Sequence, residues 1–229
     1  MSETPDIPSI FFYILSTGLP TTLLLTGIGL LLGLIIGLAL ALMRIYGAKE
    51  LMWFASGYEK VFRGIPILVL IFIFAFGIPV EFLWYINPLQ RPLFSVFLAL
   101  GLRSGAYQSQ IFRGAINSVN FGQMEAARSI GMSGFQSFIH IIFPQALRLA
   151  LPSWSNEYAV VIKDSSFAYA IGIIELTRAA NRISFNYPEL WAPTMVIVAI
   201  IYFLFTFPVT NFFGERQTKK LKKLGLGGG

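Results

Sequence analysis

Long apolar runs alternate with short polar segments along this chain, and the runs have the length that a membrane crossing needs. The first run, 19–43, contains no charged residue. As a helix it would measure roughly 37 Å, enough to cross the hydrocarbon core with some tilt. Four further apolar runs follow at 58–79, 93–111, 143–162 and 191–213. The pattern therefore predicts an all-α integral membrane protein with five transmembrane helices.

Glycine and proline positions refine two of these helices. Gly29, Gly33 and Gly37 recur on one face of the first span. Such spacing of small residues predicts that another helix packs closely against that face. The Gly-Ile-Pro stretch at 64–66 should kink the second span near its start, because proline removes a backbone donor and clashes with the preceding turn.

The remaining segments are assigned from their length and polarity. The apolar stretch 167–176 is too short to cross a bilayer and is typical of a re-entrant or interfacial piece. Segment 1–18 is expected on the outer surface, with 7–16 as a short helix. We therefore expect a membrane domain over 19–213, interrupted by a polar loop at 117–138 and followed by a basic tail at 214–229.

Charge distribution predicts the orientation of the chain. Lys and Arg collect on cytoplasmic loops of membrane proteins. The segment before Leu19 has no Lys or Arg, whereas the loop between spans one and two and the C-terminal tail are basic. The residues concerned are Arg44, Lys49, Lys60, Arg63, Arg216, Lys219, Lys220, Lys222 and Lys223. The N-terminus is therefore expected outside and the C-terminus in the cytoplasm, although Arg178 and Arg182 count against this orientation.

Composition excludes several other classes of protein. Hydrophobic residues make up 55% of the chain and charged residues only 12%, against about 25% in soluble domains. The net charge of +6 follows the membrane topology and does not indicate nucleic-acid binding. Cysteine is absent and His140 is the one histidine, so we expect no disulfide and no metal site. No G-x-x-x-x-G-K-[ST] phosphate loop is present, so we expect no catalytic residues and no bound cofactor in this chain.

The polar loop at 117–138 contains the sequence QMEAARSIGM, in which good helix formers end at Gly131. It predicts a short helix, a glycine turn and a second short helix leading into span four. One interpretation is an amphipathic helix resting on the membrane surface. The other is insertion into a cleft of a protein partner, because Ala126 and Ala127 offer little apolar area to a membrane while Glu125 can pair with a basic residue.

The loop resembles the EAA loop of membrane subunits in bacterial ABC importers. The shared pattern is Glu125-Ala126-Ala127, then Gly131, Ile141 and Pro144 at the family's spacing, with Phe143 where the family usually has Leu. Further segments resemble the polar amino-acid permease branch in the same order. They are 58–66, 104–107, 111–114, 144–148, 156–157, 163–166 and 171–177. The similarity covers roughly 18–216.

This resemblance implies the transmembrane domain of a type I ABC importer in a bacterial or archaeal plasma membrane. It implies a permease for amino acids that binds two cytoplasmic ATPase subunits, which hold ATP and Mg²⁺. It also implies a second permease copy or a homologous permease, and an external substrate-binding protein. In such importers the loop is the coupling helix, so the expected ATPase-coupling residues are Glu125, Ala126, Ala127 and Gly131.

Charged residues inside the expected spans are candidates for substrate contact. Arg103 lies near the middle of span three, where a lipid-facing charge costs about 2.5–3.5 kcal/mol, so it should face the bundle interior. Where span four ends, Lys163, Asp164 and Ser165 precede the short apolar piece, and Glu157 lies within the span. An amino acid needs a cation for its carboxylate and an acceptor for its ammonium, and these residues offer both.

Several alternatives remain open from the sequence. Arg103 can instead neutralise Glu157 and hold two helices together, and Lys163-Asp164 can be an ordinary pair at a membrane boundary. Substrate selection can also rest with the binding protein alone. An ion-coupled secondary transporter would explain Arg103 and Glu157 but not the Glu-Ala-Ala loop. A non-transporting scaffold would leave the polar stripe at 103, 107 and 110 unexplained.

Overall fold

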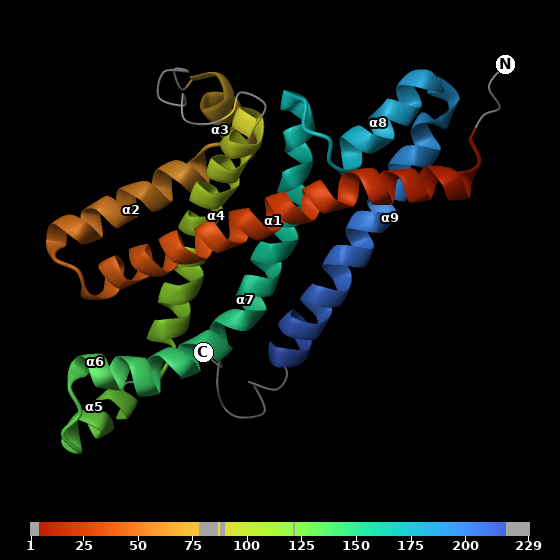
Figure 1. Ribbon diagram of the computed structural model, residues 1–229. Coiled ribbons are helices and arrows are strands. Elements are labelled where there is room, and N and C mark those ends of the chain that lie inside the picture. The colour runs from red at the N-terminus through yellow and green to blue at the C-terminus, as the bar shows by residue number, and fades with distance from the viewer. Residues whose placement is uncertain (1–4, 78–86, 88–89, 121, 219–229) are drawn as a thin grey trace.

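The computed structural model describes residues 5–77, 87, 90–120 and 122–218. All regular elements in these ranges are helical (Figure 1), which confirms the predicted all-α class. Two helical segments, Ile7–Tyr46 and Pro188–Thr218, are long and apolar enough to cross a membrane, and a bent pair of helices gives a third candidate span.

Helix α1 (Ile7–Tyr46) is continuous over 40 residues, so it begins well before the expected start of span one at residue 19. The stretch 7–16, expected as a separate surface helix, forms its first turns. Ile10 and Ile14 are fully buried in a cluster with Leu176 and Ala180. This packing extends the helix beyond the apolar run that the sequence marks.

The predicted kink in span two is present as a sharp break. Helix α2 (Lys49–Gly64) ends before Pro66, and α3 (Ile67–Phe72) continues into the π-helix η1 (Ile73–Gly77). The helix direction bends by 102° between the two halves. Residues 78 and 79 of the expected span lie outside the described residues.

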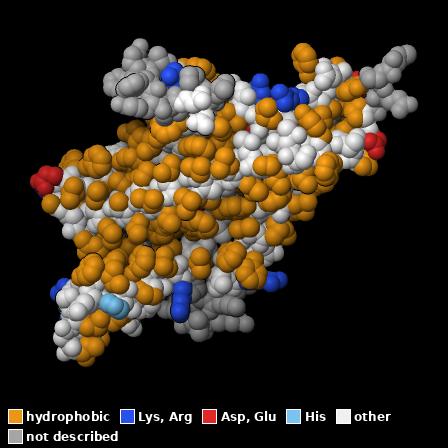
Figure 2. Space-filling view, in the orientation of Figure 1, with side chains coloured by type: hydrophobic (Ala, Val, Ile, Leu, Met, Phe, Trp, Pro, Cys, Tyr) orange, Lys and Arg blue, Asp and Glu red, His pale blue; other side chains and the backbone are white. Residues whose placement is uncertain are grey.

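Three long helices run beside one another across the bundle. They are α4 (Arg91–Asn117), α7 (Phe143–Asp164) and α9 (Trp191–Val209), which continues as the π-helix η7 (Thr210–Glu215). Helix α1 crosses them obliquely and packs most extensively on α4 (Figure 1). In Figure 2 hydrophobic side chains cover most of the visible face, while Lys and Arg side chains gather toward its upper and lower margins.

Short helices close the two ends of the bundle. At one end lie α5 (Gly122–Ser129), α6 (Gly134–Ser137) and the π-helix η4 (Phe138–Ile142), which leads into α7. At the other end α7 passes into the 3-10 helix η5 (Ser165–Ile171), followed by α8 (Leu176–Asn186) and η6 (Pro188–Leu190). Of the expected re-entrant piece, residues 167–171 belong to η5, residues 172–175 connect it to α8, and Leu176 begins α8.

Candidate functional site

Helix α5 carries the Glu-Ala-Ala sequence and stands at one end of the molecule, away from the α8 end (Figure 1). Glu125 and Ala126 are exposed, whereas Ala127 is buried at 2% exposure. The helix thus turns a charged and a small side chain outward and holds itself against the bundle through Ala127. Ile130 and Phe135 are more than three-quarters exposed beside it, at 79% and 76%.

Gly131 ends α5 in a conformation that favours glycine. Its φ is +87°, in the left-handed region where a Cβ clashes with the backbone. Its N–H donates to the carbonyl of Arg128 at 3.0 Å, and the N–H of Met132 donates to that of Ala127 at 3.2 Å. These two bonds define a Schellman cap. The following helix α6 begins with a capping box formed by Ser133 and Gln136, so both sides of the turn are locally specified.

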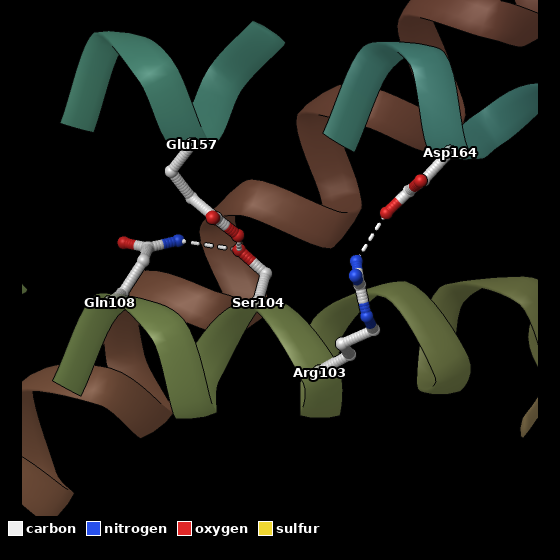
Figure 3. Close-up of polar contacts among 5 residues, drawn as sticks. All are labelled: Arg103, Ser104, Gln108, Glu157 and Asp164. Carbon is white, nitrogen blue, oxygen red and sulfur yellow. Dashed lines mark hydrogen bonds and ion pairs between the residues drawn. The ribbon is translucent and has the colours of Figure 1, made fainter. Parts of the chain in front are cut away.

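A polar cluster joins α4 to α7 in the interior (Figure 3). The guanidinium of Arg103 donates to the carboxylate of Asp164 in an ion pair, with side chains 17% and 15% exposed. The hydroxyl of Ser104 donates to Glu157 at 2.8 Å, and Glu157 is 5% exposed. Glu157 and Asp164 are two helical turns apart on one face of α7, so each meets a different residue of α4.

Gln108 extends this cluster to α1. Its amide nitrogen donates to Ser104 Oγ at 3.0 Å and to the backbone carbonyl of Leu30 at 3.1 Å. Its amide oxygen accepts from Trp154 Nε1 at 3.0 Å. The fully buried Gln108 is thus tied to α1, α4 and α7. A Cβ on Gly33 of α1 would lie only 2.7 Å from the amide nitrogen. The close contact therefore depends on the missing side chain at Gly33.

The five residues expected near substrate make different contacts. The structure brings Arg103 and Asp164 into contact, while Glu157 takes Ser104 as its partner and not Arg103. Lys163 is exposed at the end of α7. Ser165 is fully buried, and its hydroxyl donates to the carbonyl of Ile162 at 2.7 Å.

One buried acid was not among the residues expected from the sequence. Glu59 of α2 is 4% exposed. It accepts from Ser109 Oγ at 2.7 Å and from Gln110 Nε2 at 3.4 Å, and lies 3.9 Å from Arg113. A carboxylate inside the apolar run 58–79 was the signal that could have revealed it, since an acid in a span needs polar partners.

A second such acid, Glu175, fixes α8 at the opposite end of the molecule from α5. Burial raises the pKa of its carboxyl, and hydrogen bonds from the backbone N–H groups of Thr177 and Arg178 and from the Tyr202 hydroxyl oppose that rise. The carboxylate caps the N-terminus of α8. The backbone of Leu176 lies only 2.6 Å from the position that a Cβ on Gly18 would take, so α8 packs closely against α1. The bond from Tyr202 joins Glu175 to α9.

Within the described residues no three His, Asp or Glu side chains gather as a metal site.

Comparison with known proteins gives consistent matches. Residues 29–223 match the family model described as binding-protein-dependent transport system inner membrane component. The nopaline transport system permease protein NocM of Agrobacterium fabrum is 38% identical over 206 residues, which cover 86% of this chain and 83% of the relative. The glutamine transport system permease protein GlnP of Escherichia coli K12 is 33% identical over 224 residues, 96% of each chain. A crystal structure of an amino acid ABC transporter with histidines superposes with a TM-score of 0.78 at 31% identity, covering 94% of this chain and 99% of that one.

Proposed function

The chain belongs to the family of binding-protein-dependent transport system inner membrane components, and from that premise we propose that it is the permease subunit of an ATP-driven importer for amino acids. It has the fold of a type I ABC permease and is a multi-pass inner-membrane protein. The observation that carries the proposal is the exposed α5 with its glycine turn. It offers a contact surface through which an ATPase subunit can transmit the energy of ATP hydrolysis to this chain.

Coupling takes place through α5. Glu125 and Ala126 insert into a groove of a cytoplasmic ATPase subunit, where Glu125 pairs with a basic residue and the small Ala126 leaves clearance. Ala127 holds the helix to the permease, and Gly131 provides the turn behind it. Since α6 and η4 connect α5 directly to α7, a displacement of α5 reaches the helix that carries Glu157 and Asp164.

The chain crosses the membrane five times, with the N-terminus outside and the C-terminal tail in the cytoplasm. The spans are α1, the bent pair α2 with α3–η1, α4, α7 and α9. Arg44 and Lys49 beside the turn between α1 and α2, Arg128 in α5 and the basic residues of the C-terminal sequence support this orientation. Helices α4 and α7 carry internal charges, and those charges find partners within the bundle, as a membrane interior requires.

The complete importer contains further subunits. Two ATPase subunits hydrolyse ATP in the cytoplasm, and a second copy of this chain or a homologous permease completes the pathway. An external binding protein delivers the substrate. The names of the relatives refer to nopaline, glutamine and amino acids, and the substrate proposed for this chain is an amino acid or a derivative of one.

The substrate passes along the polar cluster between α4 and α7. Arg103 or Lys163 takes the carboxylate of the amino acid, and Asp164 or Glu157 accepts from its ammonium group. Ser165, whose hydroxyl bonds to Ile162, fixes the end of α7 beside them. The ion pair between Arg103 and Asp164 supplies one group of each charge at one place.

One measurement tests the assignment. The permease, co-purified with its ATPase subunits and reconstituted in vesicles, should hydrolyse ATP faster when the loaded binding protein is outside, and amino-acid uptake should require ATP. Uptake driven by a proton or sodium gradient without ATPase subunits would instead favour an ion-coupled secondary transporter.

A further inference from the structure

Two arginines from different helices meet on one aromatic ring. The guanidinium carbon of Arg63, at the C-terminal end of α2, lies 5.1 Å from the ring centroid of Tyr107 on α4. The guanidinium carbon of Arg103, one turn before Tyr107, lies 5.0 Å from the same centroid. Both distances are within cation–π range, so the ring holds both groups.

The two arginines differ in their ion pairs within the described residues. Asp164 pairs with Arg103, but within the described residues no carboxylate forms an ion pair with Arg63. Glu59, one turn earlier on α2, is bonded to Ser109 and Gln110 instead. Arg63 is exposed, so its donors are available to a ligand.

Arg103 also has an unused donor. Its Nε is buried and has no hydrogen-bond partner within the described part of the chain. A buried donor without a partner is unfavourable, and buried polar groups normally bond to protein or to ordered water. Arg103 therefore has donor capacity beyond its pair with Asp164.

The two guanidinium groups repel each other. They share one ring, so their central carbons are within about 10 Å, which is about the screening length in 0.1 M salt. The ring compensates part of this repulsion. A carboxylate bound between or beside the guanidinium groups would relieve the rest, and Arg is the side chain that suits carboxylates geometrically.

We propose that Arg63 and Arg103, held on Tyr107, form a carboxylate-binding subsite that selects amino acids carrying a second carboxylate. The proposal rests on the function given above and specifies the substrate class of the same pathway. Asp164 accepts from the ammonium group, Arg103 takes the α-carboxylate, and Arg63 takes the additional carboxylate. A neutral isostere leaves Arg63 without a counter-charge and binds more weakly.

Binding to the permease must be measured without the external binding protein, because that protein imposes its own selection. The permease with its ATPase subunits is placed in nanodiscs without nucleotide and titrated calorimetrically. The probes are L-glutamate against L-glutamine and L-aspartate against L-asparagine, pairs that differ in one carboxylate. The wild-type complex should bind each anionic member at least about tenfold more tightly.

Arg63→Gln should weaken binding of the anionic probes about 10- to 100-fold and change the neutral ones less than about twofold. Arg63→Lys, which keeps the charge but not the planar fork, should fall between. Lys60→Gln is the matched control: it removes one positive charge from an exposed position on the same helix, and within the described residues Lys60 makes no cation–π contact with Tyr107. It should leave the preference unchanged.

The proposal is overturned if the wild-type complex binds both members of each pair equally, if it binds none of the four probes, or if Arg63→Gln weakens both members equally. ATP-dependent uptake stimulated by the binding protein is followed in parallel. If uptake persists but the permease shows no carboxylate preference, the subsite proposal is wrong and the importer function stands. If ATP-dependent uptake is absent, the importer function itself is wrong. Gel filtration of each variant shows that it remains assembled.

Discussion

The backbone N–H of Met132 donates to the carbonyl oxygen of Ala127 at 3.2 Å, and this bond closes the C-terminal end of α5. It forms only because Gly131 between them has a φ of +87°. The exposed Glu125 and Ala126 thus stand on a helix whose end is set by one residue's backbone conformation, which ties the geometry of the coupling segment to that glycine.

Gly131→Ala should impair coupling because an alanine in the left-handed region costs about 1–2 kcal/mol. The Schellman cap then opens in part of the molecules, and ATPase stimulation by the loaded binding protein should fall several-fold. Gly114→Ala is the control, since Gly114 lies in α4 with a helical backbone and open space where a Cβ would be added. Equal stimulation in both variants would contradict the role given to the turn.

Glu125→Lys should uncouple ATP hydrolysis from uptake. The substitution places a positive charge where a basic residue of the ATPase is expected, and a like-charge contact at an interface costs several kcal/mol. Uptake into vesicles should fall more than tenfold, while the amount of permease in the membrane fraction is unchanged because Glu125 is exposed in this chain. Glu125→Gln, which removes the charge without reversing it, should retain part of the uptake. Normal uptake by Glu125→Lys would refute the coupling role.

Much of the local structure could be predicted from the sequence because single residues impose it. Pro66 breaks the second span, Gly131 ends α5, and both effects come from the backbone of one residue. The spacing of Gly29, Gly33 and Gly37 likewise predicted close packing, and a Cβ at each position would lie within 3 Å of a residue of α4.

Long-range relationships could not be predicted in the same way. The first turns of α1 are stabilised by Ile10 and Ile14 packing on α8, a contact between segments far apart in the chain. The choice of Asp164 over Glu157 as the partner of Arg103 depends on how α4 and α7 are rotated and shifted relative to each other. Helical periodicity gives the face of each helix but not that register.

The ion pair between Arg103 and Asp164 should contribute measurably to stability. Both side chains are mostly buried, so removing one partner leaves a charge poorly compensated. Arg103→Met and Asp164→Asn should each lower the free energy of unfolding by about 1–3 kcal/mol. The double variant should lose less than the sum, with a coupling energy within about 0.5–3 kcal/mol.

Thermal unfolding of the purified permease complex measures this double-mutant cycle. The matched cycle uses Lys163→Met with Asp164→Asn, because Lys163 is adjacent to Asp164 but exposed. The coupling energy between Lys163 and Asp164 should be clearly smaller than that between Arg103 and Asp164. If the losses in unfolding free energy from Arg103→Met and Asp164→Asn simply add, the ion pair contributes nothing to the stability of the fold. The two residues are then free to separate around a substrate.

Gly37→Ala should destabilise the contact between α1 and α4. A Cβ at residue 37 would lie 2.7 Å from Gln108 Cβ, 2.9 Å from the backbone nitrogen of Ser109 and 3.0 Å from the carbonyl oxygen of Gly105. Two of these three atoms belong to the backbone of α4, so the helices must move apart. Overpacking of this kind costs about 1–3 kcal/mol.

The comparison for Gly37→Ala is Gly27→Ala on the same helix, where nothing lies within 4 Å of the added Cβ. Because alanine favours a helix over glycine by about 0.5–1 kcal/mol, Gly27→Ala should leave the melting temperature unchanged or raise it, while Gly37→Ala lowers it. The buried Gln108 would shift with α4, so uptake by Gly37→Ala should fall as well. If both variants instead melt at the wild-type temperature, α1 and α4 are not packed through this glycine face.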